Sequence, residues 1–478
     1  MNLDALVSTV EDDVLPGLAY SLASKRGAAY VKERNFSTFH PATSNTYSIP
    51  AQRVIRVVLS DSGSSMLDLS TVRVACTITN KSGTQPLYLT GRHLACMFQR
   101  TTVRCKGVIT DDVSYYHRLV GTLMNLRPLN SLYSDGPSQL GTGFSDYTKV
   151  GTNLFTNGMI LGGPEVDPIP ANNSRKVVFD LPGISLFNSH YLLPIGRFPV
   201  ELTLELVSDT SLVCAKKYVD AAGASKPDGG NLSQEFELSD VTVKADTLLL
   251  DSAVTANIDE ALTGGKPLTL HLRPWTVQRY TVTGSPSFSQ IFSRAYSRLL
   301  SMFINFLPKK VPDAAGWYTE SNLFSCWHGI KNDDGAWLPG TKPDYSFASD
   351  QFRFQVQLGS QLYPQVPIES TAEAYYQLQK CVGALTTGVG IASGPTFRST
   401  NFHAAVDFER VGSTPAGEAA FTGQNTKLAG EQLRILFENL TSRKAGDNSW
   451  DWTPDAMFVI CNYDEVCQLR LEGVLVAD

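Results

Sequence analysis

The sequence has little charge and no cluster of positive charge. Charged residues account for 18% of the 478 residues, and the formal net charge is -6. The longest basic runs are pairs, such as Lys25 with Arg26 and Lys309 with Lys310. Proteins that bind DNA or RNA through the phosphate backbone need clustered Lys and Arg side chains. We therefore expect no sequence-specific nucleic-acid binding and no direct wrapping of a genome by this chain.

Cysteine is scarce too. The chain has eight cysteines, which are too few and too scattered for a disulfide framework in a protein of this length. Cys76 and Cys461 fall in apolar, strand-like segments. We expect the cysteines to be reduced thiols in the core of a protein that is made inside a cell.

Long hydrophobic runs are missing. The N-terminal segment has neither the basic start nor the unbroken apolar run of a signal peptide. The nearest candidate for a membrane span, residues 292–307, is interrupted by Arg294 and Arg298. The sequence therefore predicts a chain that is not secreted through a signal peptide and that has no membrane span.

Enzyme motifs are absent as well. No G-x-S-x-G motif occurs, and the P-loop-like segment LTGGKPL has Pro267 where a magnesium-binding Ser or Thr is required. No two of the seven histidines lie two or four residues apart, and Cys461 and Cys467 lack a C-x-x-C partner. We read Asp111 and Asp112 as helix-capping residues rather than catalytic acids. The sequence predicts no enzyme, no catalytic residue, no metal site and no cofactor.

What the sequence does contain is many short β-branched segments bounded by turn residues. With few helices between them, such segments favour antiparallel sandwiches, and eight strands per unit with long crossovers favour jelly rolls. We predict an all-β fold of two tandem eight-stranded antiparallel jelly-roll sandwiches with short helices and long loops. The strand-like segments are 53–60, 71–80, 95–107, 175–183, 198–208 and 236–250 in the first half, and 267–284, 299–308, the start of 351–380, 400–411, 431–441, 456–466 and 468–478 in the second.

A strand, a turn and a short helix with two adjacent tyrosines occur twice. The first copy carries Tyr115 and Tyr116, and the second, about half a chain later, carries Tyr375 and Tyr376. This repeat predicts the duplication of one sandwich. We expect one tyrosine of each pair to pack on its sandwich and the other to reach a subunit interface. A stacking platform for bases or sugars is the alternative.

Both helices have start signals. The first is expected over residues 113–124, with Asp111 or Asp112 as its N-cap. The second should begin with an S-x-x-E capping box formed by Ser370 and Glu373. Each helix therefore falls in the middle of its half of the chain.

Composition divides the chain into four parts. Residues 1–45 look like an N-terminal arm, whose short amphipathic helix is ended by Pro16 and Gly17. The segment 252–266 is the best boundary between the halves. The assigned ranges are 46–251 for the first jelly roll with a long loop at 128–174, 252–266 for the linker, and 267–478 for the second jelly roll with a long loop at 308–349.

Several phrases of the sequence carry a resemblance to a known family. They are STFHPATSNTYSIPAQRVIRVVLSDSGSSMLDLSTVRVACTIT near the start, FDLPGISLFNSHYLLPIGRFPVELTLEL at the close of the first half, and SRAYSRLLSMFINFLP and FQVQLGSQLYPQVPIESTAEAYYQL in the second. From about residue 36 onward the chain resembles the double jelly-roll major capsid proteins of icosahedral double-stranded DNA viruses, of the polinton-like virus, virophage or adintovirus type.

The resemblance implies a structural function without catalysis or cofactor. In that family three chains form a pseudo-hexagonal capsomer, because six similar rolls approximate six-fold symmetry, and such capsomers tile the shell. For this chain it implies a homotrimer in the capsid of a virion, with penton and minor capsid proteins as further partners. The arm would face the inner side. The loops that would form outward towers or clasp neighbours are 128–174, 308–349 and 412–430.

The tryptophans leave a second function open. Four of the six lie in loop-rich segments, and aromatic loops on a β-sandwich are a common way to hold sugars. A tandem β-sandwich carbohydrate-binding, lectin-like protein is therefore the alternative. A β-sandwich glycosidase, which needs two facing carboxylates, is a third class. The tryptophans are Trp275, Trp317, Trp327, Trp337, Trp450 and Trp452.

Overall fold

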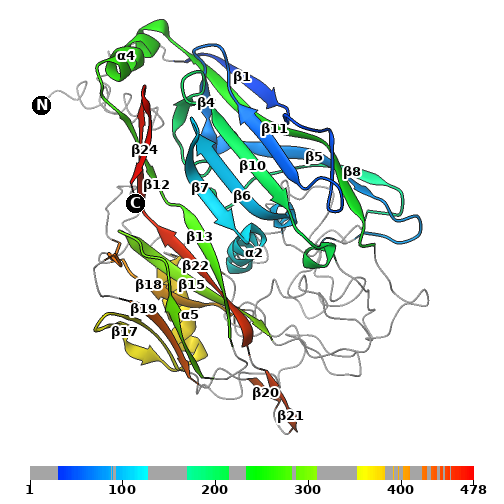
Figure 1. Cartoon of the computed structure of the whole chain (residues 1–478), viewed down its shortest axis with the longest axis vertical. Coiled ribbons are helices and arrows are strands. Elements are labelled where there is room, and N and C mark those ends of the chain that lie inside the picture. The colour runs from blue at the N-terminus through cyan, green and yellow to red at the C-terminus, as the bar shows by residue number, and fades with distance from the viewer. Residues whose placement is uncertain are drawn as a thin grey trace, which may run out of the picture.

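The computed structural model of the chain describes residues 31–87, 89, 93–127, 169–214, 233–282, 287–308, 353–382, 391, 397, 402–409, 423–427, 432–438, 442–444, 447–452 and 454–477. Within these ranges the chain forms two β-sandwiches, one after the other, with three α-helices (Figure 1). The first 30 residues of the predicted arm, and most of the three predicted long loops, lie outside the described residues.

The first sandwich consists of two antiparallel sheets. Its strands are β1 (Val31–Phe39), β2 (Thr46–Ser48), β3 (Val54–Leu59), β4 (Met66–Asp68), β5 (Arg73–Asn80), β6 (Phe98–Cys105), β7 (Val108–Ser114), β8 (Ser174–Phe179), β9 (Leu192–Pro194), β10 (Val200–Leu206) and β11 (Phe236–Leu250). One sheet has the order β8-β5-β11-β4-β9, with β1 and β2 also paired to β11. The other has the order β3-β10-β6-β7.

Alternation of apolar and polar residues explains why these segments form sandwich strands. In β10, Val200, Leu202 and Leu204 are fully buried, while the residues between them are partly exposed. In β3, Ile55 and Val57 are buried in the same way. Successive side chains of a strand point to opposite faces, so a period of two places one face of each sheet in the core.

The second sandwich has two four-stranded antiparallel sheets. Its strands are β13 (Trp275–Thr281), β14 (Phe288–Phe292), β15 (Leu299–Pro308), β16 (Arg353–Leu358), β17 (Gln361–Ile368), β18 (Ala404–Asp407), β19 (Leu433–Glu438) and β22 (Pro454–Tyr463). One sheet has the order β13-β22-β15-β18, and the other β14-β19-β16-β17. A separate hairpin is formed by β20 (Ser442–Lys444) and β21 (Asp447–Trp452).

The two sandwiches have the same topology. If the eight principal strands of each are numbered in chain order, with β1 and β2 sharing the first position and the short β4 and β9 left aside, one sheet reads 1-8-3-6 and the other 2-7-4-5 in both. This is the strand order of a jelly roll. A helix joins the fifth strand to the sixth in both, namely α2 (Tyr116–Leu126) and α5 (Thr371–Cys381). The predicted all-β fold of two tandem jelly rolls is confirmed.

Several segments differ from the sequence-based prediction, among them strands β7, β14 and β17, which lie outside the predicted strand-like segments. The segment 252–266 contains a helix, α4 (Ser252–Thr263), capped by the Asp251 carboxylate, which accepts a hydrogen bond from the Ala253 N–H at 2.8 Å. The segment 468–478 is part of a hairpin of β23 (Glu465–Arg470) and β24 (Gly473–Ala477), and β23 pairs with β12 (Leu268–Leu272). Residues 31–39, counted above with the arm, form β1. Strands β1 and β23 are set by strand partners that lie far away in the sequence, which sequence periodicity does not report.

The sandwiches lie next to each other along the long axis of the molecule (Figure 1). Strand β7 and helix α2 of the first sandwich contact β13 of the second, and β24 also contacts β7. We call this contact region the seam. Strands β1 and β17 lie toward opposite ends of the molecule, away from the seam (Figure 1).

Candidate functional site

The seam joins distant parts of the chain through aromatic, cationic and polar side chains. One aromatic ring at its centre, Phe458 on β22, is 3% exposed. The Tyr115 ring of the first sandwich meets it edge-on with 5.6 Å between centroids, and the Arg118 guanidinium lies 5.0 Å from its centroid. Arg279 of β13 approaches the same ring at 5.9 Å. A buried ring between an aromatic edge and guanidinium groups gains cation–π attraction in addition to apolar burial.

Beside this ring a chain of buried polar groups crosses the seam. The Asn305 side-chain amide on β15 donates a hydrogen bond to the Thr122 hydroxyl on α2, which donates onward to the Arg118 carbonyl at 2.8 Å. The Asn305 carbonyl oxygen is bonded to Nδ1 of His403. An amide oxygen only accepts, so His403 Nδ1 carries the proton in this bond. Each of these side chains is at most 2% exposed, so each hydrogen bond matters for the free energy of unfolding.

Asp111 and Tyr116 hold the first sandwich's side of the seam in place. The buried Asp111 carboxylate accepts hydrogen bonds from the Ser185 N–H at 2.9 Å, the Ser185 hydroxyl at 2.7 Å and the Leu186 N–H at 3.3 Å. Burial raises the pKa of Asp111, against the effect of these hydrogen bonds. The Tyr116 hydroxyl donates to the Pro182 carbonyl at 2.8 Å. Asp111 thus ties β7, and Tyr116 ties the start of α2, to the segment that follows β8.

The prediction that Asp111 or Asp112 caps the first helix is wrong. Both residues lie in β7, where they pair with Val103 and Thr102 of β6. Asp112 forms a two-pronged ion pair with Arg100, at 2.9 and 2.8 Å. Helix α2 begins only at Tyr116, and its N-cap residue Tyr115 has a left-handed backbone (φ 53°) and no side-chain cap. The sheet partners of the two carboxylates replace local capping.

The capping box of the second helix is confirmed in its main part. The Ser370 hydroxyl accepts a hydrogen bond from the Glu373 N–H at 3.1 Å, and α5 starts directly after Ser370. The Glu373 carboxylate accepts from the Glu369 N–H at 2.8 Å, one residue before the position that the motif predicts.

The two tyrosine pairs do not occupy matching helix positions. Tyr115 and Tyr116 stand at the start of α2, whereas Tyr375 and Tyr376 lie one turn inside α5. Tyr116 is fully buried and Tyr115 contacts the second sandwich of its own chain. Tyr375 packs on Phe397, with 5.1 Å between centroids, while Tyr376 is 49% exposed. Packing by one member of each pair is therefore confirmed, and the outward-facing member in α5 is Tyr376.

Six of the eight cysteines match the predicted reduced core thiols. All seven cysteines in the described residues are free, and six of them are buried. Burial raises the pKa of Cys76, Cys96 and Cys461 to about 12. The described residues contain no group of three or more His, Cys, Asp or Glu side chains arranged to hold a metal ion. Cys326 lies outside the described residues.

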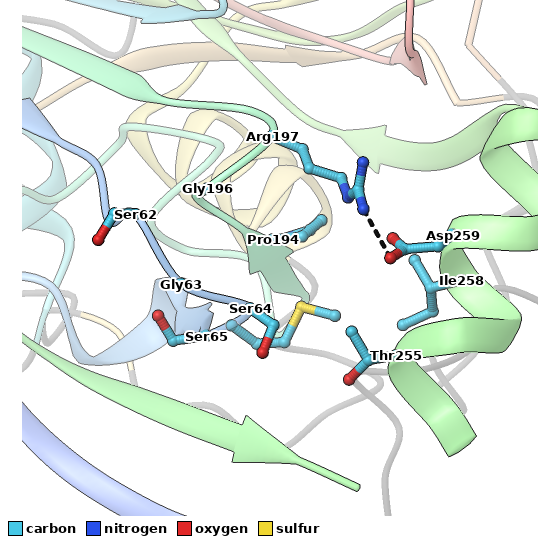
Figure 2. A pocket seen from close by; sticks show the side chains of 11 residues that line it. Ser62, Gly63, Ser64, Ser65, Pro194, Gly196, Arg197, Thr255, Ile258 and Asp259 are labelled. Atoms are coloured by element: carbon cyan, nitrogen blue, oxygen red, sulfur yellow. Dashed lines mark ion pairs between the residues drawn. The ribbon is translucent and has the colours of Figure 1, made fainter. Parts of the chain in front are cut away.

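The structure has one pocket next to α4 and another at the seam. One, of about 370 Å³, lies between the serine-rich turn after β3, the loop after β9, and α4 (Figure 2). The Arg197–Asp259 ion pair, 2.6 Å long, joins that loop to α4 at the pocket (Figure 2). The other, of about 360 Å³, is lined by Leu123 and Met124 of α2 together with Trp275 of β13. Among the described residues, neither pocket is lined by a histidine or cysteine.

Tryptophan positions bear on the sugar-binding alternative. Trp275 begins β13 and packs on Phe303 of β15 in the same sandwich, with 5.7 Å between ring centroids. It also lines the pocket that Leu123 and Met124 of α2 border, so it lies in a strand beside the seam and not in an outward loop. Trp450 and Trp452 lie in β21. The three others, at 317, 327 and 337, lie outside the described residues.

None of the helices in the described ranges combines the length and apolar character that a bilayer crossing requires.

Comparisons with known proteins find similarity in structure. No protein-family model matches the chain, and no curated protein matches it in sequence. The crystal structure of VP54 of PBCV-1, fitted into a cryo-EM reconstruction of the virophage Sputnik, is 12% identical with a TM-score of 0.54, covering 96% of this chain and 100% of that chain. A quasi-atomic model of the PBCV-1 virus capsid is 13% identical with the same TM-score and coverage.

The cryo-EM structure of the Sputnik virophage is similar to the same degree. It is 10% identical with a TM-score of 0.54, and the match covers 96% of this chain and 91% of that chain. At these identities the similarity shows a shared fold, extending over nearly the whole chain.

Proposed function

We propose that this chain is a structural major capsid protein, which forms pseudo-hexagonal trimeric capsomers that tile an icosahedral shell around a double-stranded DNA genome. The observation that carries the proposal is the pair of topologically identical jelly rolls, fixed side by side by a buried seam. The shared fold with the PBCV-1 capsid and the Sputnik virophage over 96% of the chain supports it.

The duplication gives a physical reason for this assembly. Two equivalent rolls in one chain give six in a trimer, and six similar units arranged in a ring present nearly equivalent edges to six neighbours. A rigid seam suits this purpose, because the two rolls of a chain must keep one relative orientation in every copy. Lattice contacts that are individually weak then add up, since many identical interfaces form together.

The proposed partners follow from the same assembly. They are further copies of this chain, within the trimer and between capsomers, with penton and minor capsid proteins completing the shell. The proposed location is the capsid of the virion. The chain's work in this setting is the burial of complementary surfaces, with no catalytic step.

The mass of the purified protein in solution tests the proposal. Size exclusion coupled to light scattering should give three times the 52.2 kDa of one chain, and negative-stain images of the same peak should show hexagonal outlines or closed shells. A protein that stays monomeric at every concentration would overturn the capsid assignment, and screening against a glycan array would then test the lectin-like alternative.

A further inference from the structure

The internal duplication relates the seam to a second pair of surfaces. The seam joins β7 and α2 of the first sandwich to β13 of the second. By topology, the equivalents of β7 and α2 in the second sandwich are β17 and α5, and the equivalent of β13 in the first is β1. If the contact between sandwiches is repeated from one chain to the next, it joins β17 and α5 of one copy to β1 of another.

The surface on the second sandwich is apolar and open. In β7, which the seam covers, three of seven residues are buried, whereas in β17 only one of eight is. Val366 is 74% exposed and Leu362 is 37% exposed on β17, and Tyr376 is 49% exposed on α5. Three large apolar side chains exposed on these two adjacent elements are typical of a protein contact surface rather than of a solvated face.

The surface on the first sandwich is open in the same way. Strand β1 has no buried residue among its nine, whereas β13, its equivalent at the seam, has two among seven. Phe36 on β1 is 68% exposed, the largest fraction on this sandwich among the large apolar side chains. Its ring has the Lys244 ammonium 5.7 Å from the centroid, as the Phe458 ring at the seam has Arg118.

These two surfaces are far apart on one chain. Strands β1 and β17 lie toward opposite ends of the molecule (Figure 1). A contact from β17 of one chain to β1 of the next is therefore heterologous, and a repeated heterologous contact either closes into a ring or continues as a filament. A trimer of two-roll chains is the closed case.

We infer that β17 and α5 of one chain bind β1 of a second copy of the chain, with Leu362, Val366 and Tyr376 packed around Phe36. The inference rests on the proposed function and names the surfaces through which its trimer closes. Pro364 and Pro367 leave β17, an edge strand of its sheet, with two fewer N–H donors, so the contact is made by side chains and not by extension of a sheet.

Three cations next to the two surfaces have carboxylate partners in their own chain. On β1, Arg34 pairs with Asp246, and Lys32 pairs with Asp251 at 3.4 Å. Next to β17, Arg353 pairs with Glu369 at 2.9 Å. Because these three cations are already paired within their own chain, the contact does not leave them buried without a partner. A buried charge without a partner would be strongly destabilising.

Aspartate substitutions test the two surfaces. Val366→Asp and Phe36→Asp each place a charge in the contact and should weaken trimer association about tenfold or more, seen as monomer by light scattering. Val178→Asp is the matched control, because Val178 is 43% exposed on β8, whose equivalent β18 has no part in the seam. Circular dichroism of each variant checks that it is folded.

The outcomes separate the inference from the proposed function. A trimeric wild type with both variants monomeric and the control trimeric supports the inference. Variants that remain trimeric beside a trimeric wild type overturn the inference and leave the proposed function standing. A wild type that is monomeric throughout overturns the proposed function and the inference together.

Cross-linking gives a readout that does not depend on destabilising the trimer. The double variant Phe36→Cys with Val366→Cys, treated with a short bis-maleimide, should give two- and three-chain products on a denaturing gel, while each single variant should give only the single chain. Six of the seven described native cysteines are buried, and untreated and treated wild type give the background. Equal cross-linking by Phe36→Cys alone, or none by the double variant in a trimer, would overturn the inference.

Discussion

Replacing Asn305 by leucine is expected to destabilise the second sandwich and its seam. The Asn305 amide joins two buried groups, the Thr122 hydroxyl on one side and His403 Nδ1 on the other. Thr122 keeps its own bond to the Arg118 carbonyl at 2.8 Å. His403 Nδ1, in contrast, loses the acceptor of its proton in a site where the ring is fully buried.

The size of the effect follows from these contacts. A buried donor that loses its acceptor costs about 1–3 kcal/mol, and overpacking by the bulkier leucine adds about 1 kcal/mol. The free energy of unfolding should therefore fall by about 2–4 kcal/mol. For a cooperative unit of 150–250 residues each kcal/mol corresponds to about 2–4 °C, so the thermal midpoint should fall by about 4–16 °C.

Differential scanning calorimetry at a fixed protein concentration measures this shift, because midpoints of assembling proteins depend on concentration. Asn257→Leu, at an exposed position of α4, is the control and should change stability by no more than about 0.5 kcal/mol. The double variant Asn305→Leu with His403→Phe should recover at least half of the loss, because both polar partners are then gone. A single variant with an unchanged midpoint, or a double variant with simply additive losses, would refute the assigned polar chain.

Three further predictions concern single side chains. Burial lowers the pKa of His117 well below its usual value, so as the pH falls the unfolded chain binds this proton before the folded chain does. The contribution of His117 to stability is therefore fully present above about pH 6.5 and is lost as the pH falls below it. Thermal midpoints measured between about pH 7.5 and 5 should fall for the wild type and fall less for His117→Gln. Phe458→Ala should lower the free energy of unfolding by about 3–5 kcal/mol, because it leaves a cavity at the centre of the seam. Phe36→Ala should leave the chemical denaturation midpoint of the monomer unchanged. Equal effects of the two substitutions would contradict the burial of Phe458. Tyr376→Pro should remove a hydrogen bond of α5 and lower the free energy of unfolding by about 3 kcal/mol. Tyr376→Ala should lower it by less than about 1 kcal/mol. Calorimetry of these two variants checks the helix assignment.

Most strands were predictable from sequence because their signal is local. Segments such as 198–208 and 236–250 alternate apolar and polar residues, and they became β10 and β11 with few changes at their ends. The start of α5 was predictable for the same reason, since Ser370 and Glu373 carry the capping signal within four residues. The equivalence of the two halves then followed from the repeat of strand, turn and helix.

Partners far away in the sequence explain what local patterns did not give. Asp111 has the local pattern of a helix cap, but Ser185 and the ladder with β6 hold it in a strand. The segment 252–266 has the composition of a linker, and it is a helix that the Arg197–Asp259 ion pair ties to the first sandwich. A local pattern gives the choices that are open to a segment, and the distant partner selects among them.

The sequence by itself determined the fold class, the duplication and the core, because the period-two burial of apolar residues is written into each strand and repeats in both halves. Only the tertiary structure decided how the halves meet. The contact of Tyr115 and Arg118 with Phe458, and the bond from Asn305 to Thr122, join residues from opposite halves of the chain. No periodicity relates such residues, so the seam, and the pair of open surfaces equivalent to it, appear only once the two sandwiches are folded and packed.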